Sequence, residues 1–267
     1  MGIVADMSET TETMADRATD GLIRTFRICI MYVPGSNHKV SPSGVHLFQS
    51  TVPLAMLNGV QALGLRPDPA EVAAFAEEAA GFGLPWSIVT RGEPGREIVD
   101  IARRHGLTAS STTPLLARDL ADIDDVLVDV PAEATVRRID SAHGEVFAEA
   151  LAVGFDMPRS IADVFALPGM LADPAVEAFV LDVDGVAVAT GENVVDGADV
   201  GMYNGTARPE YRRKGYFRAL VSARLRDAVA RGARFAFTQN SPMSRPLYES
   251  LGFRVVEDWT YLTKSGD

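Results

Sequence analysis

The stretch that decides the fold reads NGTARPEYRRKGYFRAL and occupies residues 204–220. A β-like run leads into it, and a helix follows whose apolar residues recur at helical spacing from Phe217 to Val229. Backbone N–H groups at the start of a helix have no partners inside the helix, so a tight turn at Gly215 directs several of them toward one anion. This strand–loop–helix unit, with its cluster of basic residues, predicts a diphosphate-binding loop.

The segment ARPEYRRKGYF, residues 207–217, resembles the acetyl-CoA signature of the GNAT N-acetyltransferase superfamily, Val-x-Pro-x-x-Arg-x-x-Gly-x-Gly/Ala. Three positions match: Pro209, Arg212 and Gly215. Ala207 replaces the usual valine, and Phe217 replaces the second small residue. A bulky side chain at that position requires that it point into the core from the first turn of the helix.

A second segment, NSPMSRPLYESLGF at residues 240–253, resembles the second signature of the same family, which ends in Leu-Tyr-x-x-x-Gly-Phe. The two segments together, in this order and at this separation, are far more specific than Arg-x-x-Gly alone. The resemblance covers residues 134–264. It implies an α/β fold with a mixed, mostly antiparallel sheet flanked by helices, and direct acetyl transfer from acetyl-CoA to an amine of a small molecule or peptide.

The resemblance also implies roles for individual residues. Tyr248 matches the tyrosine general acid of the family, and a strand amide near Ala207 is the expected donor to the thioester carbonyl. Asn240 either contacts the pantetheine arm or the substrate side, or is only a turn residue. From its place on an expected strand near the cleft, Glu192 is the candidate general base; the alternatives are that it is merely an exposed strand residue and that a water chain takes the proton. The expected cofactor-binding residues are Ala207, Arg208, Pro209, Arg212, Arg213, Lys214, Gly215, Tyr216, Phe217 and Asn240.

Composition narrows the classes of partner. The chain has 267 residues, an apolar fraction of 47% and a net charge of −11, which argues against nucleic acid or an anionic membrane as the main partner. Cys29 is the only cysteine, so no internal disulfide forms, and the four scattered histidines predict no metal site. We expect a reducing, cytoplasmic location. Residues 1–20 carry no signal peptide or membrane anchor and are expected to form a disordered tail.

Local signals predict the order of the elements. In the first half we expect a strand over 24–32, an extended segment over 50–58, and a helix that begins after the capping residue Asp68. The expected elements that follow are a strand over 86–90, a helix over 95–105 and a strand over 108–117. In the second half Asp184-Gly185 predicts a two-residue hairpin. The remaining expectations there are strands over 134–139, 176–183, 186–194, 234–238 and 254–262, a helix capped by Ser141, and a helix capped by Ser241.

The two halves look related. The sequence MLNGV at 56–60 precedes MYNGT at 202–206 by the same separation as Gly106-Leu107 precedes Gly252-Phe253. We infer an internal repeat, although two unrelated segments sharing a common pattern remain an alternative. The expected domains are a tail (1–20), a degenerate GNAT-like lobe (21–128) and an acetyl-CoA-binding GNAT domain (129–267). The first lobe has no matching basic loop, so we expect it to bind no cofactor.

Two other functions fit the same motifs. One is a non-catalytic acetyl-CoA-binding protein with a regulatory or sensor role. The other is a two-lobed enzyme that resembles mycothiol synthase, a thiol-sugar acetyltransferase. The sequence identifies neither the amine acceptor nor an interface, and we expect a monomer or a homodimer.

Overall fold

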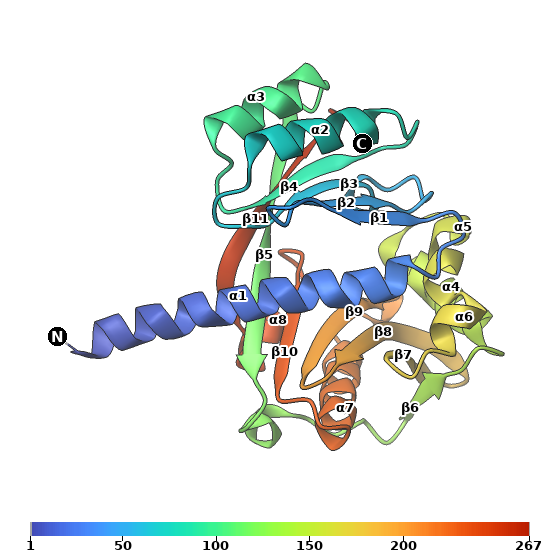
Figure 1. The fold of residues 1–267 in the computed structure, drawn as a ribbon. Coiled ribbons are helices and arrows are strands. Elements are labelled where there is room, and N and C mark those ends of the chain that lie inside the picture. Colours follow the sequence, from blue (N-terminus) through green and yellow to red (C-terminus); the bar gives the residue numbers. More distant parts are fainter. Residues whose placement is uncertain (1, 267) are drawn as a thin grey trace. The chain divides into compact units, whose positions relative to one another are not determined.

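The chain divides into two compact units in the computed structural model, which describes residues 2–266 and the side chains of residues 14–266 (Figure 1). Unit 1 comprises Met1–Tyr32 and Leu116–Arg254, and unit 2 comprises Val33–Leu115 and Val255–Asp267. This division differs from the one expected between residues 128 and 129. The N-terminal segment groups with the second half of the chain, whereas the C-terminal strand groups with the first half.

Unit 1 is built on a sheet with the strand order β10-β9-β8-β7-β6. Strands β6, β7, β8 and β9 pair antiparallel with one another in that order, and β10 pairs parallel with β9. Its strands are β6 (Ala134–Ile139), β7 (Val176–Val183), β8 (Val186–Asp196), β9 (Asp199–Ala207) and β10 (Phe235–Gln239). Its α-helices are α1 (Gly2–Ile30), α4 (Gly144–Phe155), α5 (Arg159–Ala162), α6 (Pro168–Leu171), α7 (Tyr216–Ala230) and α8 (Arg245–Ser250). The short 3-10 helices are η2 (Ile123–Val126), η3 (Asp163–Ala166) and η4 (Pro209–Tyr211).

Most of the local predictions for this unit are confirmed. Asp184 and Gly185 have φ angles of 50° and 79°, which is the positive-φ geometry of the tight hairpin turn between β7 and β8. Two helix starts differ from the prediction. His143, not Ser141, precedes α4, and α8 begins after Ser244 rather than after Ser241.

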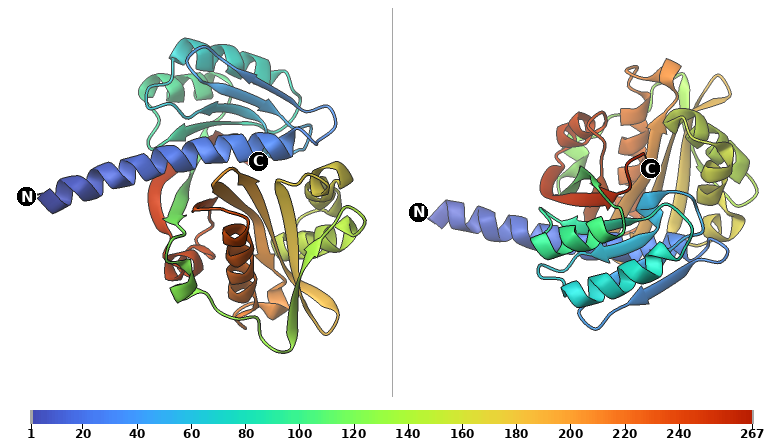
Figure 2. Two further views of the ribbon diagram at one scale, coloured as in Figure 1. Left: turned by 60° about the horizontal axis from the view of Figure 1, so that its bottom comes forward. Right: turned by 90° about the horizontal axis from the view of Figure 1, so that it is seen from above.

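Helix α1 contradicts two predictions. The expected disordered tail over 1–20 and the expected strand over 24–32 are both wrong, because a single helix runs through Gly2–Ile30. The buried positions include Met14, Ala18, Leu22 and Thr25, a spacing of three to four residues that places them on one face of the helix. This face packs on β8, β9 and β10 within unit 1 (Figures 1 and 2).

Polar contacts fix α1 to the sheet. Arg17 and Arg24 both pair with Asp199 on β9, at 2.7 and 2.8 Å, and Thr25 Oγ1 lies 2.5 Å from the Tyr203 hydroxyl. Gly21 explains how the helix approaches so closely, because a Cβ there would lie 2.5 Å from the ring of Phe237. The mid-helix glycine therefore serves packing rather than flexibility.

Unit 2 has the strand order β1-β2-β3-β4-β11. Its elements are β1 (Asn37–Val40), β2 (His46–Gln49), η1 (Ala55–Leu57), β3 (Gly59–Ala62), α2 (Pro69–Ala80), β4 (Ser87–Arg91), α3 (Arg96–Arg104) and β11 (Arg254–Thr263). The predicted cap is confirmed, since the Asp68 side chain accepts a hydrogen bond of 2.8 Å from the Ala70 amide. A cluster of buried residues including Val60, Val72 and Ile88 joins this sheet to α2 and α3. The segment expected to be extended over 50–58 contains the helical turn η1 instead.

The last strand of the chain completes unit 2. Strand β11 pairs antiparallel with β4, in the register Trp259↔Arg91 to Leu262↔Ile88. In the other direction, β5 (Ala109–Asp119) begins in unit 2 and ends in unit 1. Each unit therefore contains strand residues from both halves of the sequence. No helix within the described residues has the length and apolarity needed to cross a membrane.

Candidate functional site

The site begins where β9 loses its pairing with β10. The parallel ladder runs from Asp199↔Phe235 to Gly201↔Phe237 and ends there, although both strands continue. The hydroxyl of Thr238 donates to the Met202 carbonyl at 2.9 Å just beyond that point. Within the described residues, the C-terminal part of β9 has only β8 as a strand neighbour.

A β-bulge lies in this half-paired part of β9. The register with β8 shifts between Thr190 and Glu192, and Asn204 has a φ of 51°. Thr190 Oγ1 donates to the Asn204 carbonyl at 2.9 Å, which holds the bulge in place. Because a bulge takes backbone groups out of the ladder, it supplies donors for an external oxygen such as a thioester carbonyl.

The loop after β9 leads into α7 as the signature predicts. Gly215 has a φ of 89° and is the N-cap of α7, so the free amides of the first turn follow it directly. Arg213 also has a positive φ, of 62°, and its side chain and that of Lys214 are exposed. Left-handed residues on either side of Lys214, directly before a helix start, turn the backbone into the kind of amide nest that binds phosphate.

Two of the expected phosphate-binding arginines have structural partners. The Arg212 guanidinium donates to the carbonyls of Ala207 and Gly154, at 3.0 and 2.7 Å. Arg208 donates to the Ala187 carbonyl at 2.8 Å. Their side chains therefore brace the loop, which leaves its amides and the charges of the exposed residues to contact an anion. Pro209 begins the turn η4 within this loop.

Two aromatic residues frame the start of α7. The Tyr216 hydroxyl donates to Glu133 at 3.3 Å and so points away from the bulge. The Phe217 ring packs against the buried cluster between the sheet and α7, as its bulk requires. The end of that ring also lies beside β9, 3.0 Å from the position a Cβ on Gly205 would take. Phe217 thus reaches the bulge itself.

Tyr248 on α8 lies on the same side of β9. Its side chain is buried, its ring meets that of Phe253 edge-on at 5.3 Å, and its hydroxyl lies 3.4 Å from the Cβ position of Gly205. Burial raises the pKa of the Tyr248 phenol, and the positive charge of Arg224 and hydrogen bonds with Arg224 and Asn240 oppose that rise. The Tyr248 hydroxyl therefore lies beside the bulge in β9.

Asn240 has the contacts of the turn residue that was one of the two roles left open by the sequence. It is buried, and its amide donates to Ser244 Oγ at 3.1 Å, as a residue that forms the turn before α8 would. It also interacts with the Tyr248 hydroxyl. Asn240 therefore ties the start of α8 to the tyrosine.

Glu192 lies across β8 from these groups, on the face that α1 covers. Its side chain is only 1% exposed, and burial raises the pKa of the carboxyl to about 7. The Asn204 amide donates to one carboxyl oxygen at 3.3 Å, and the Cys29 thiol donates to the other at 3.6 Å. Burial and the neighbouring carboxylate raise the pKa of Cys29 well above its ordinary value. A carboxyl with a pKa near 7 can accept a proton at neutral pH.

Sequence reasoning missed two contributors. Arg224 on α7 is completely buried, and Cys29 reaches Glu192 from α1. For Arg224 a signal existed, because it lies on the buried stripe of α7, three residues after Val221 and four before Ala228. For Cys29 the misassigned helix removed any signal.

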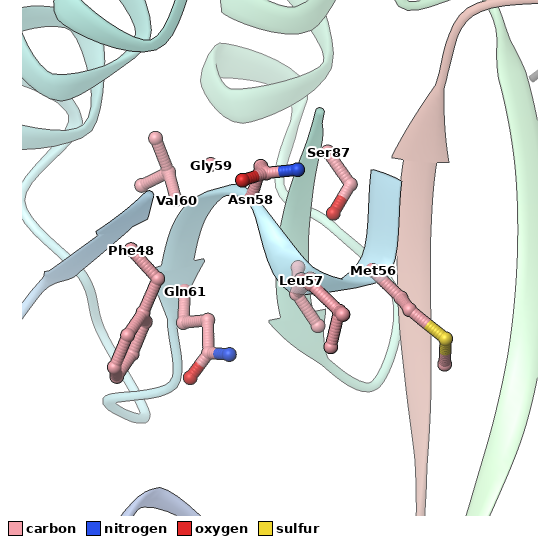
Figure 3. Close-up of a pocket in the computed structure, with 9 residues that line it drawn as sticks. Phe48, Met56, Leu57, Asn58, Gly59, Val60, Gln61 and Ser87 are labelled. Carbon is pink, nitrogen blue, oxygen red and sulfur yellow. The ribbon is translucent and has the colours of Figure 1, made fainter. Parts of the chain in front are cut away.

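Unit 2 holds a separate, small pocket. Figure 3 shows its lining, with Phe48 and Gln61 pointing to one side of β2 and β3 and Val60 to the other. The pocket has essentially no room for a water molecule, whereas ordinary ligand sites enclose roughly 300–1,000 Å³. Its lining contains no charged residue. Among the described residues, no group of three or more His, Cys, Asp or Glu side chains is placed to hold a metal ion.

Comparison with known proteins identifies the segment that carries the site. Residues 145–253 match the model of the acetyltransferase (GNAT) family. This segment is a GNAT acetyltransferase domain. It includes the bulge, the loop, Tyr248 and Glu192, and the family implies acetyl transfer from acetyl-CoA. The comparison with curated proteins found no match.

Solved structures share the fold of the whole chain. A GCN5-related N-acetyltransferase from Kribbella flavida is 19% identical, with a TM-score of 0.66, and the match covers 96% of each chain. A tandem GNAT protein from the clavulanic acid biosynthesis pathway is 15% identical, with a TM-score of 0.56, covering 86% of this chain and 83% of that one. At these identities the likeness shows the fold alone. The fold is the predicted one, two GNAT-like lobes in tandem on a mixed, mostly antiparallel sheet flanked by helices.

Proposed function

We propose that this protein is an N-acetyltransferase that moves an acetyl group directly from acetyl-CoA to an amine of a small molecule or peptide. The observation that carries the proposal is the placement of two groups on either side of the bulge in β9. The buried Tyr248 hydroxyl lies beside Gly205, and the Glu192 carboxyl, with its pKa of about 7, is bonded to Asn204. An acid and a base flank the backbone that would receive the thioester carbonyl.

The chemistry assigned to these groups balances. The amine nitrogen bonds to the acetyl carbon while the carbon–sulfur bond breaks. The amine loses a proton to Glu192, and Tyr248 gives its hydroxyl proton to the departing thiolate. A backbone N–H at the bulge stabilises the negative charge that develops on the carbonyl oxygen. The amides at the start of α7 and the exposed side chains of Arg213 and Lys214 hold the diphosphate of CoA.

We assign cofactor binding to this lobe alone. In unit 2, β3 and β4 are the counterparts of β9 and β10 in the internal repeat, but their parallel ladder runs from Gly59↔Ser87 to Ala62↔Thr90. A Cβ on Gly59 would lie 2.1 Å from the Ser87 carbonyl oxygen, so the two backbones are in close contact. The strands therefore leave no space between them for a pantetheine arm. This supports a structural role for the degenerate first lobe.

The test is the change Tyr248→Phe, which removes only the hydroxyl. We expect turnover with an amine found by screening for CoA release to fall at least about tenfold, while acetyl-CoA affinity is nearly unchanged. Tyr261→Phe on β11 is the matched control and should retain full turnover. Unchanged turnover in Tyr248→Phe would remove this tyrosine from the mechanism. Binding of acetyl-CoA without CoA release from any amine would favour the non-catalytic sensor.

A further inference from the structure

Arg224 is an arginine that the sheet and α7 bury completely, in the interior of unit 1. Its Nε donates to Asn193 Oδ1 at 3.1 Å, and the Asn193 amide returns a bond of 3.0 Å to the Arg224 carbonyl. Burying a guanidinium is costly unless its hydrogens are satisfied by well-placed acceptors. A charge kept at this position therefore calls for a functional reason.

The guanidinium lies directly against the bulge. Its Nη2 donates to the Glu192 carbonyl at 2.5 Å and to the Tyr203 carbonyl at 3.3 Å, the two residues paired across β8 and β9 next to the bulge. Gly191 makes room for it, since a Cβ there would lie 2.1 Å from Nη1. Arg224 thus holds the two strands at the point where their register shifts.

The guanidinium also acts on the groups on either side of the bulge. Its Nη1 is buried and has no partner at ordinary hydrogen-bond geometry among the described residues, but the guanidinium interacts with the Tyr248 hydroxyl. The positive charge acts on Tyr248 on one side and on Glu192 on the other, and in both cases it favours the ionised form. The other groups that act on the Glu192 carboxyl are Asn204 on β9 and Cys29 on α1.

We propose that Arg224 is a positioning residue: it holds the β9 bulge in shape through the carbonyls of Glu192 and Tyr203, and its charge acts on the Glu192 carboxyl beside that bulge. This inference rests on the proposed acetyl transfer for its catalytic consequence. The structural coupling between Arg224 and Glu192 stands apart from that reaction and can be measured without a substrate.

The experiment compares three variants of the full chain. Arg224→Met removes the charge and keeps an unbranched side chain, a replacement that buried ionic sites often tolerate. Arg224→Lys keeps the charge but cannot bridge two carbonyls in the same way. Arg226→Met is the control, because this neighbouring α7 arginine contacts Val128 and Asp129 instead. Circular dichroism and acetyl-CoA binding check that each variant is folded.

The first measurement is the titration of the Glu192 carboxyl carbon by NMR, with the resonance assigned by its loss in Glu192→Gln. We expect the titration to move to higher pH in Arg224→Met, to stay near the wild-type position in Arg224→Lys, and to be unchanged in Arg226→Met. The same titration in wild type and in folded Arg224→Met would overturn the proposal, whether or not any amine is acetylated.

The second measurement is turnover with an accepted amine. We expect kcat to fall on the order of a hundredfold in Arg224→Met, the loss typical of a deleted electrostatic donor, and Arg224→Lys to recover part of it. Where Arg224→Met does not fold, the lysine variant decides. Full kcat in Arg224→Lys would show that the bridge to the two carbonyls has no role. If wild type acetylates no amine, the proposed function fails while the titration still tests the coupling.

Discussion

Glu192 is a carboxyl group that burial keeps largely protonated below neutral pH. Its pKa is raised from an ordinary 4.5 to about 7 because the desolvation of the charged form outweighs the bonds from Asn204 and Cys29 and the charge of Arg224. Such a group costs stability in the pH range where the proposed reaction needs it ionised. This conflict between stability and activity is typical of a residue retained for chemistry.

The conflict predicts the effect of Glu192→Gln on stability. A carboxyl whose pKa is raised on folding stabilises the native state fully below its unfolded pKa of 4.5. That stabilisation is lost as the pH rises through about 7, a change of about 3 kcal/mol over the whole range. The glutamine variant has no such loss, so the difference between its melting temperature and that of wild type should shift in favour of the variant as the pH rises from 5 to 9. Thermal melts across this range measure it.

The control for this experiment is Glu145→Gln. Glu145 is exposed on the first turn of α4, so its replacement should shift the melting temperature by a similar small amount at every pH. A difference between Glu192→Gln and wild type that stays constant from pH 5 to pH 9 would contradict a raised Glu192 pKa.

At the scale of elements, we propose that the loop between β9 and α7 binds acetyl-CoA through its backbone. Gly215 needs a φ of 89°, a conformation that costs a β-branched residue about 1–3 kcal/mol or distorts the turn. We therefore expect Gly215→Val to raise the Kd for acetyl-CoA about tenfold or more, and Arg213→Ala to raise it less. Isothermal titration calorimetry with acetyl-CoA gives both values.

Gly232 supplies the control for the loop. It follows α7 with a φ of 103° and lies at the other end of that helix, so Gly232→Val introduces similar strain without touching the loop. Its Kd should match that of wild type. A larger loss of affinity in Arg213→Ala than in Gly215→Val would mean that side-chain charge, rather than the amide nest, carries the binding.

The sequence predicted those elements that carry strong local signals. The turn at Asp184-Gly185, the cap at Asp68 and the strand–loop–helix unit around Gly215 each depend on neighbouring residues, and each is present. Helix α1 was missed because residues 24–32 end in a short apolar run, residues 28–32, that fits a buried strand as well as a helix. Gly21 and the charges of residues 1–20 also argue against a helix. Tertiary contacts decided that segment, including the pairing of Arg24 with Asp199.

The candidate site shows the same limit. Tyr248 and Glu192 could be proposed from motif and strand position, and the structure puts both beside the bulge. For Arg224 the sequence offered only its position among the apolar residues of α7, and for Cys29 it offered no signal, because the importance of both arises from contacts between α7, α1 and the sheet. A sequence pattern assigns residues to an element, but it does not reveal which buried charge a neighbouring element provides.

For the whole molecule, the composition of the two units has a consequence for folding. Unit 1 takes α1 and residues 116–128 from outside the second half of the chain, and unit 2 takes β11 from the C-terminal end. A cut between residues 128 and 129 would therefore remove from each unit a segment that belongs to it. For this reason we expect that the internal repeat does not mark two independently folding pieces.

The last prediction concerns such a cut. A fragment of residues 129–267 lacks α1, so the face of β8, β9 and β10 that carries Glu192 and Tyr203 becomes exposed, and β11 loses its partner β4. We expect this fragment to be poorly folded and prone to aggregation, because unpaired strands and uncovered apolar faces favour association.

Co-expression with residues 1–128 should restore a soluble complex that binds acetyl-CoA. Chromatography, circular dichroism and calorimetry measure the outcome, with the full chain as the control. A monomeric 129–267 fragment that binds acetyl-CoA as tightly as the full chain would show that α1 and the partner strands are dispensable.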